Sequence, residues 1–211
     1  MVGNKLALAE KGQPAMSPPA SRLRFAVVDI GSNSIKFLVG EPLKTRLRVV
    51  DEDSLGTRLA EGILRTGELK TEAMARTFEA LRQLKTRAEN LGVVQIKAVA
   101  TSAVRDSTNR KSFLREAKSI LQTPIQILSG DQEAEAIFAG VSLDPFFRKN
   151  EVISLEVGGG SAQWAQGKNG RVDHRLSLPL GAVRLRERFI EDHPVGEKPL
   201  THMRQAQAEQ R

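Results

Sequence analysis

One short segment occurs twice in this chain, and the repeat constrains the fold more than any other feature. "DIGSNSIKFLVG" (29–40) aligns with "EVGGGSAQWAQG" (156–167) at a constant offset of 127 residues. Acid meets acid, glycine meets glycine at the start of each turn, and serine meets serine at its end. In each copy an apolar run ends at the acid, and a second apolar-containing run leaves the turn. The repeat predicts a duplicated strand-turn-strand unit.

Apolar periodicity between the two copies predicts an α/β fold. Strands are predicted at 23–30, 34–41, 45–54, 94–101 and 125–128, and helices at 71–92, 110–122 and 131–143. Antiparallel hairpins that lead into a β-α-β unit favour a mixed sheet with helices on both faces. The strand pattern then restarts at 151–183, where Asn169-Gly170 is typical of a hairpin turn.

These patterns divide the chain into four parts. We expect a flexible tail at 1–21, a complete domain at 22–128, a linking helix with the opening strands of a similar second domain at 129–190, and a polar tail or the start of a further region at 191–211. Three strands cannot bury both faces of a sheet. We therefore expect a truncated second domain with exposed apolar strand surface, and a homodimer or aggregate that covers it.

Composition narrows the classes of partner. The formal net charge of +7 favours acidic partners. The chain has no tyrosine and one tryptophan, which argues against specific nucleic-acid binding by stacking. With no cysteine, disulfides and cysteine-ligated metal are excluded. No apolar run reaches the roughly 18 residues of a membrane helix, and no signal-peptide core is present, so we expect a cytoplasmic protein without a membrane partner.

The repeated turn has a chemical meaning of its own. Glycine permits backbone angles that aim successive N–H groups into one concavity, where they can hold phosphate oxygens. A carboxylate at the end of the incoming strand can hold Mg²⁺ next to those oxygens. Two such turns across a cleft would grip a phosphate from both sides. The alternative is a pair of unrelated glycine-rich hairpins.

The turns resemble the phosphate loops of the actin, Hsp70 and sugar-kinase superfamily, which has an RNase H-like fold. The chain is more closely similar to the exopolyphosphatase and guanosine pentaphosphate phosphatase family (Ppx/GppA). The similarity covers about residues 24–190. Five segments carry it, in the family's order: "VVDIGSNSIKFLV", "AVATSAVRDSTN", "ILSGDQEAEAIFAGV", "EVGGGSAQW" and "LPLGAVRLRERF".

This resemblance implies roles for individual residues. Asp29 and Glu156 would bind Mg²⁺ or another divalent cation, and Glu133 would be the base that activates the attacking water. Lys36 and Arg105 would add positive charge to the phosphate site. The phosphate-binding backbone would be that of Gly31, Ser32, Asn33, Ser34, Gly158, Gly159, Gly160 and Ser161. From the residues alone, Lys36 can equally be a solvated strand lysine, Arg105 a capping arginine and Glu133 a first-turn acid that favours the helix dipole.

The second turn departs from the family's usual Asp-Ile-Gly-Gly-Gly-Ser-Thr-Glu. Glu156 is one methylene longer than aspartate, so a bound metal would shift or bind through water. Ala162 lacks a hydroxyl, and Gln163 lacks a charge. The glycine nest is retained.

The resemblance implies a hydrolase that releases terminal phosphate from polyphosphate or the 5′ γ-phosphate from guanosine pentaphosphate. Two alternatives remain open. A truncated member could bind polyphosphate or a nucleotide without turnover, and the shared superfamily fold also supports ATP-dependent kinases. A kinase would need an adenosine pocket, which the residues present do not indicate.

Overall fold

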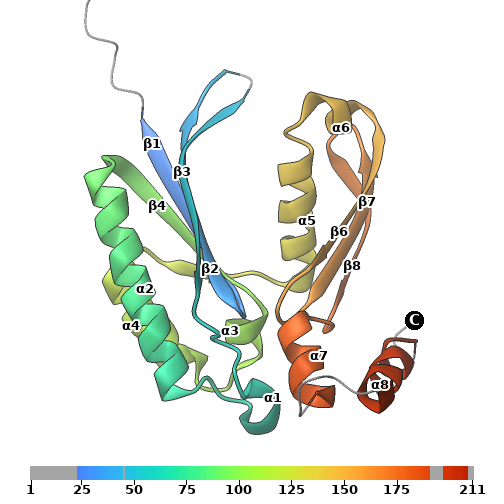
Figure 1. Cartoon of the computed structure of the whole chain (residues 1–211). Helices are drawn as coiled ribbons and strands as arrows, with labels where there is room; N and C mark the ends of the chain where they lie inside the picture. The colour runs from blue at the N-terminus through green and yellow to red at the C-terminus, as the bar shows by residue number, and fades with distance from the viewer. Residues whose placement is uncertain (1–22, 45, 191–196, 209–211) are drawn as a thin grey trace, which may run out of the picture.

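The computed structural model describes residues 23–44, 46–190 and 197–208. Figure 1 shows two sheets side by side, each with helices packed against it. The elements are, in chain order, β1 (Arg24–Ile30), β2 (Ser34–Pro42), β3 (Leu47–Gly56), α1 (Ile63–Thr66), α2 (Thr71–Asn90), β4 (Val93–Ala100), α3 (Ser102–Asp106), α4 (Arg110–Leu121), β5 (Ile125–Ile127), α5 (Gly130–Val141), α6 (Pro145–Lys149), β6 (Glu151–Val157), β7 (Ala162–Lys168), β8 (Arg171–Leu178), α7 (Ala182–Phe189) and α8 (Glu197–Ala208).

The first sheet has the mixed topology that the sequence predicts. Its strand order is β3-β2-β1-β4-β5. The pairs β1–β2 and β2–β3 are antiparallel, whereas β1–β4 and β4–β5 are parallel. This mixed topology is the one expected from the resemblance to the actin, Hsp70 and sugar-kinase superfamily. Because β1 and β4 run in the same direction, the residues that follow them meet at one edge of the sheet.

The two faces of this sheet differ in kind. Side chains at alternate positions of β1 and β2, among them Val28 and Phe37, are buried in one core with Leu81 of α2 and Phe113 of α4. Figure 1 shows α2 and α4 on the same side of the sheet. Asp29 falls on the opposite face, which looks toward the second sheet.

The second sheet is antiparallel, with the order β6-β7-β8. Helix α5 packs on one of its faces, where Ala134 and Phe138 are buried with Ala165. The third predicted helix thus belongs to the second sheet. The other face is open: Ile153, Leu155 and Val157 are 62%, 69% and 60% exposed, as expected for an uncovered apolar sheet surface. The homodimer that would cover this surface stays a prediction.

Several elements were not predicted. The short helices α1, α3 and α6 contain four or five residues each, too few for a periodic signal. Helix α8 occupies the part of 191–211 for which a polar tail was one expectation. The predicted N-terminal tail lies outside the described residues. Within the residues that were searched, no helix is long and apolar enough to cross a membrane.

The repeat seen in the sequence is also a repeat in hydrogen bonding. Gly31 N–H donates to Ser34 O at 3.1 Å, and Gly158 N–H donates to Ser161 O at 2.9 Å. The same four-residue turn therefore follows β1 and β6. The two turns, which we call turn 1 (residues 31–34) and turn 2 (residues 158–161), are the repeated strand-turn-strand device that the sequence predicts.

Each turn is anchored by the segment that follows the third strand of its sheet. Thr57 and Arg58 N–H groups both donate to Asn33 O in turn 1. At the start of α7, Val183 and Arg184 N–H groups both donate to Gly159 O in turn 2. Backbone carbonyls of the turns are thereby engaged. The N–H groups of Gly31 and Gly158 close the turns, so the remaining N–H groups of each turn are the ones that could donate to an anion.

Small residues let the two turns pack directly against each other. A Cβ atom on Gly159 would lie 3.1 Å from Asn33 Cβ and 3.2 Å from Ser32 Cβ. On Gly160 it would collide with the hydroxyls of Ser32 and Ser102, which are themselves 2.7 Å apart. On Gly181, just before α7, it would collide with the backbone of turn 2. The spacing of the turns therefore depends on the absence of these side chains.

We predict that Gly181→Ala destabilises the protein by about 1–3 kcal/mol, because the new methyl group must push turn 2 away from α7. Urea unfolding measures the change. Gly56→Ala is the matched control, since a Cβ there meets nothing within 4 Å. Equal stability of the two variants would contradict the close packing of α7 on turn 2.

Candidate active site

A cavity of about 460 Å³ lies between the two turns. Both turns line it, and so do four of the predicted side chains: Asp29, Lys36, Glu133 and Glu156. These residues come from β1, β2, α5 and β6, so both sheets contribute. The structure thus brings together all of the predicted site residues except Arg105, which lines an adjoining cavity.

Asp29 is the most constrained of the carboxylates. Its Oδ1 is buried and has no hydrogen-bond partner. Burial raises the pKa of Asp29, nearby Lys36 opposes that rise, and Glu156 adds to it. A buried carboxylate oxygen without a partner is costly unless a cation or a donor reaches it.

Lys36 pairs directly opposite Asp29 in the β1–β2 ladder. Its Nζ donates to Glu156 Oε1 at 3.0 Å, which joins the first sheet to the second across the cavity. This bond raises the pKa of Lys36. The ammonium group therefore stays charged and balances the acids on both sides of the cavity.

The donor set fits a magnesium ion. Asp29 and Glu156 approach the cavity from the equivalent ends of β1 and β6, and one oxygen of Asp29 is unsatisfied. Mg²⁺ is typically held by one or two carboxylates, with water and substrate phosphate completing the shell. No group of three or more acidic or histidine side chains that could hold a metal was found among the described residues, so a cage made only of protein is not present there.

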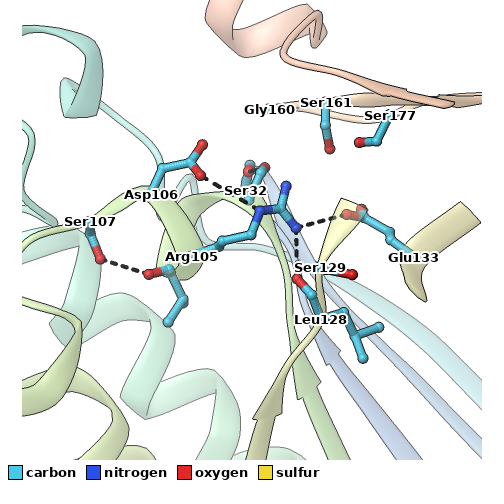
Figure 2. Close-up of polar contacts among 12 residues, drawn as sticks. Ser32, Arg105, Asp106, Ser107, Leu128, Ser129, Glu133, Gly160, Ser161 and Ser177 are labelled. Atoms are coloured by element: carbon cyan, nitrogen blue, oxygen red, sulfur yellow. Dashed lines mark hydrogen bonds and ion pairs between the residues drawn. The ribbon is translucent and has the colours of Figure 1, made fainter. Parts of the chain in front are cut away.

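Glu133 lies in the first turn of α5, behind the capping box of Ser129 and Gln132. Its side chain is 15% exposed. Figure 2 shows Arg105 reaching toward it: Arg105 Nη1 lies 3.2 Å from Glu133 Oε2 and donates to Leu128 O at 2.8 Å. Burial raises the pKa of Glu133, and Arg105 acts in the opposite direction. The result is a basic carboxylate with a fixed orientation.

Arg105 faces a neighbouring cavity of about 400 Å³, which it shares with Gly160 and Ser161 of turn 2. In Figure 2 its guanidinium group lies between Asp106 and Glu133. Its Nε is 3.6 Å from Asp106 Oδ1. This geometry favours a role for Arg105 in positioning Glu133 over a role in holding a phosphate group inside the main cavity.

Some lining residues were not singled out from the sequence. Thr101 and Ser102 follow β4 directly and line the main cavity, as does Arg186 of α7. Two features of the sequence could have indicated them. Thr101 and Ser102 follow a predicted strand, and Arg186 lies within the family segment "GAVRLRERF". Gln163, a departure from the family pattern, is buried and donates to Ser161 Oγ at 2.8 Å. It supports turn 2 without a charge.

Known proteins with a similar sequence and fold identify the family of this chain. A model of the Ppx/GppA phosphatase family matches residues 38–210. The chain belongs to the Ppx/GppA phosphatase family. A solved Ppx/GppA enzyme of Aquifex aeolicus is 28% identical, with a TM-score of 0.71, over 89% of this chain and 62% of its own. An exopolyphosphatase of Cytophaga hutchinsonii is 26% identical, with a TM-score of 0.82, over 88% of this chain and 60% of its own.

This Ppx/GppA family member thus spans about three fifths of the length of these solved relatives. The family match includes turn 2, Glu133 and Glu156, and it begins after Asp29, turn 1 and Lys36. The fold is shared with these relatives over most of the chain.

We predict that Asp29→Asn stabilises the metal-free protein at neutral pH and abolishes stabilisation by Mg²⁺. The folded-state pKa of Asp29 is raised, so the wild-type loses stability as the pH rises from about 4 through that pKa, whereas the amide does not titrate. Thermal unfolding at several pH values, with and without Mg²⁺, measures both effects. Equal stabilisation of both proteins by Mg²⁺ would exclude Asp29 as a ligand.

Proposed function

We propose that the protein is a phosphohydrolase that releases the terminal phosphate of inorganic polyphosphate or the 5′ γ-phosphate of guanosine pentaphosphate. The observation that carries this proposal is the cavity of about 460 Å³ between the two repeated turns, which Asp29, Glu133 and Glu156 all line. Its family membership supports a phosphatase.

The terminal phosphate would lie between the turns and accept hydrogen bonds from their N–H groups. Such preorganised donors stabilise the charge of a transferring phosphoryl group. Lys36, in the same cavity, would add a positive charge to that environment. The hydroxyls of Ser32 and Ser102 extend the set of donors at the base of turn 1.

Glu133 would take a proton from the attacking water. The water oxygen bonds to the terminal phosphorus, the bond from phosphorus to the bridging oxygen breaks, and the shortened chain leaves with that electron pair. Burial makes Glu133 a stronger base than a solvated glutamate, and Arg105 holds its carboxylate in place.

A Mg²⁺ ion held by Asp29 and Glu156 would supply charge neutralisation for the phosphate oxygens. Lys36 already forms an ion pair with Glu156, so it competes with the metal for that carboxylate. We propose that substrate phosphate draws the ammonium group away from Glu156, because both phosphate and carboxylate are acceptors for its donors.

The test compares two glutamates of the same helix. We predict that Glu133→Gln lowers the rate of phosphate release from polyphosphate with Mg²⁺ by about 10²–10⁴-fold, the range for a general base. Glu135→Gln should leave the rate within about twofold, because Glu135 is an exposed residue that forms a surface ion pair with Arg175.

Phosphate release that survives Glu133→Gln unchanged would contradict the proposed base. Tight binding of polyphosphate by the wild-type chain without any release would instead favour a binding module. Circular dichroism of each variant confirms that the comparison is made between folded proteins.

A further inference from the structure

A second cavity, of about 590 Å³, adjoins the candidate active site. It shares three lining residues with the first cavity, namely Asn33, Val183 and Arg186, so the two spaces meet at turn 1 and α7. Figure 1 shows α1 and α7 close together at this end of the molecule. The remaining lining residues are Arg58, Glu61, Arg65, Glu187 and Ile190.

Uncommitted positive charge distinguishes this second cavity. Among the described residues, the side chains of Arg58, Arg65 and Arg186 have no hydrogen-bond or ion-pair partner. Both of its carboxylates are already engaged. Glu61 pairs with Arg76 at 2.9 Å and Lys70 at 3.4 Å.

The second carboxylate, Glu187, accepts a hydrogen bond from Gly62 N–H at 2.7 Å. The acids of the cavity therefore serve neighbouring cations and backbone, and the three arginines face solvent. An anion that enters the cavity meets guanidinium donors that need not first leave a partner.

Arg58 is held at the junction of the two cavities by its own backbone. Its φ of 52° lies in the left-handed region, which few residues other than glycine adopt. Its N–H donates to Asn33 O in turn 1 at 2.8 Å. Conformations of this kind persist where the surroundings fix them, and they concentrate at functional sites.

We propose that the second cavity binds the internal phosphates of a linear polyphosphate whose terminal phosphate occupies the first cavity. Arg58 and Arg65 hold those phosphates, and Arg186 contacts the chain where it passes between the cavities. This inference rests on the proposed hydrolase function. It adds a subsite that makes long chains better ligands than short ones.

Guanidinium groups suit this role because each can offer paired donors to one phosphate. Successive phosphates of a polymer are successive anions, and the cavity offers three separate cations to them. A guanine base carries no negative charge, so it would leave these guanidinium groups without an anionic partner. The chemistry therefore favours polyphosphate over guanosine pentaphosphate.

The test is equilibrium binding of long-chain polyphosphate, tripolyphosphate and guanosine pentaphosphate with Mg²⁺. A Glu133→Gln background keeps the ligands intact. The variant is Arg58→Gln with Arg65→Gln, and glutamine is compatible with the backbone of Arg58 because Gln122 has a φ of 53° in this protein. The control, Arg115→Gln with Lys118→Gln, removes the same charge from the exposed side of α4.

We expect the variant to raise the Kd for long-chain polyphosphate by about tenfold or more, and the Kd for tripolyphosphate by less than about twofold. The control should change both by less than about twofold. Arg186→Gln should weaken the binding of both ligands, because Arg186 lines both cavities.

An unchanged Kd for the long chain would overturn the subsite. An equal loss of affinity for the long chain and for tripolyphosphate would overturn it too. A loss of affinity confined to guanosine pentaphosphate would also overturn the subsite, because it would assign the cavity to a nucleotide. In each case Glu133-dependent phosphate release by the chain with its arginines intact would leave the proposed function standing. Absence of both binding and release in that chain would remove the function and the subsite together.

Discussion

The rest of this molecule depends on the contact between its two glycine turns. Gly159 packs against Ser32 and Asn33, and Gly160 leaves room only for the hydroxyls of Ser32 and Ser102. Interiors as dense as this do not absorb an added methyl group without movement. The contact sets the distance between β1 and β6, and therefore the distance between the carboxylates at their ends. Backbone hydrogen bonds from residues 57–58 and 183–184 fix each turn on its own side.

Electrostatics follows from this spacing. Three carboxylates face one cavity, and the charge of Glu156 raises the pKa of both Asp29 and Glu133. Two cations offset this effect from opposite sides: Lys36 bonds to Glu156, and Arg105 bonds to Glu133. Asp29 retains a buried oxygen without a partner. The site is therefore short of positive charge at the position where we propose that a metal and a phosphate meet.

Much of this arrangement was accessible from the sequence because it is local. The repeat at an offset of 127 residues correctly identified the two turns. The placement of Arg105 beside Glu133 was not accessible, because it depends on how β5 and α5 leave the first sheet. The basic cavity of Arg58, Arg65 and Arg186 was equally hidden, since its residues come from a loop, a four-residue helix and α7. The packing of α5 on the second sheet also required the tertiary structure.

The most direct test of the account is a crystal structure of the protein with Mg²⁺ and a phosphate analogue that mimics the transferring group. The account predicts one anion that accepts hydrogen bonds from N–H groups of both turns, a metal ion bound to Asp29, and a Lys36 ammonium group that has moved from Glu156 toward the anion. An anion bound to one turn alone, or a metal ion that does not contact Asp29, would contradict the claim that the two turns form a single phosphate site.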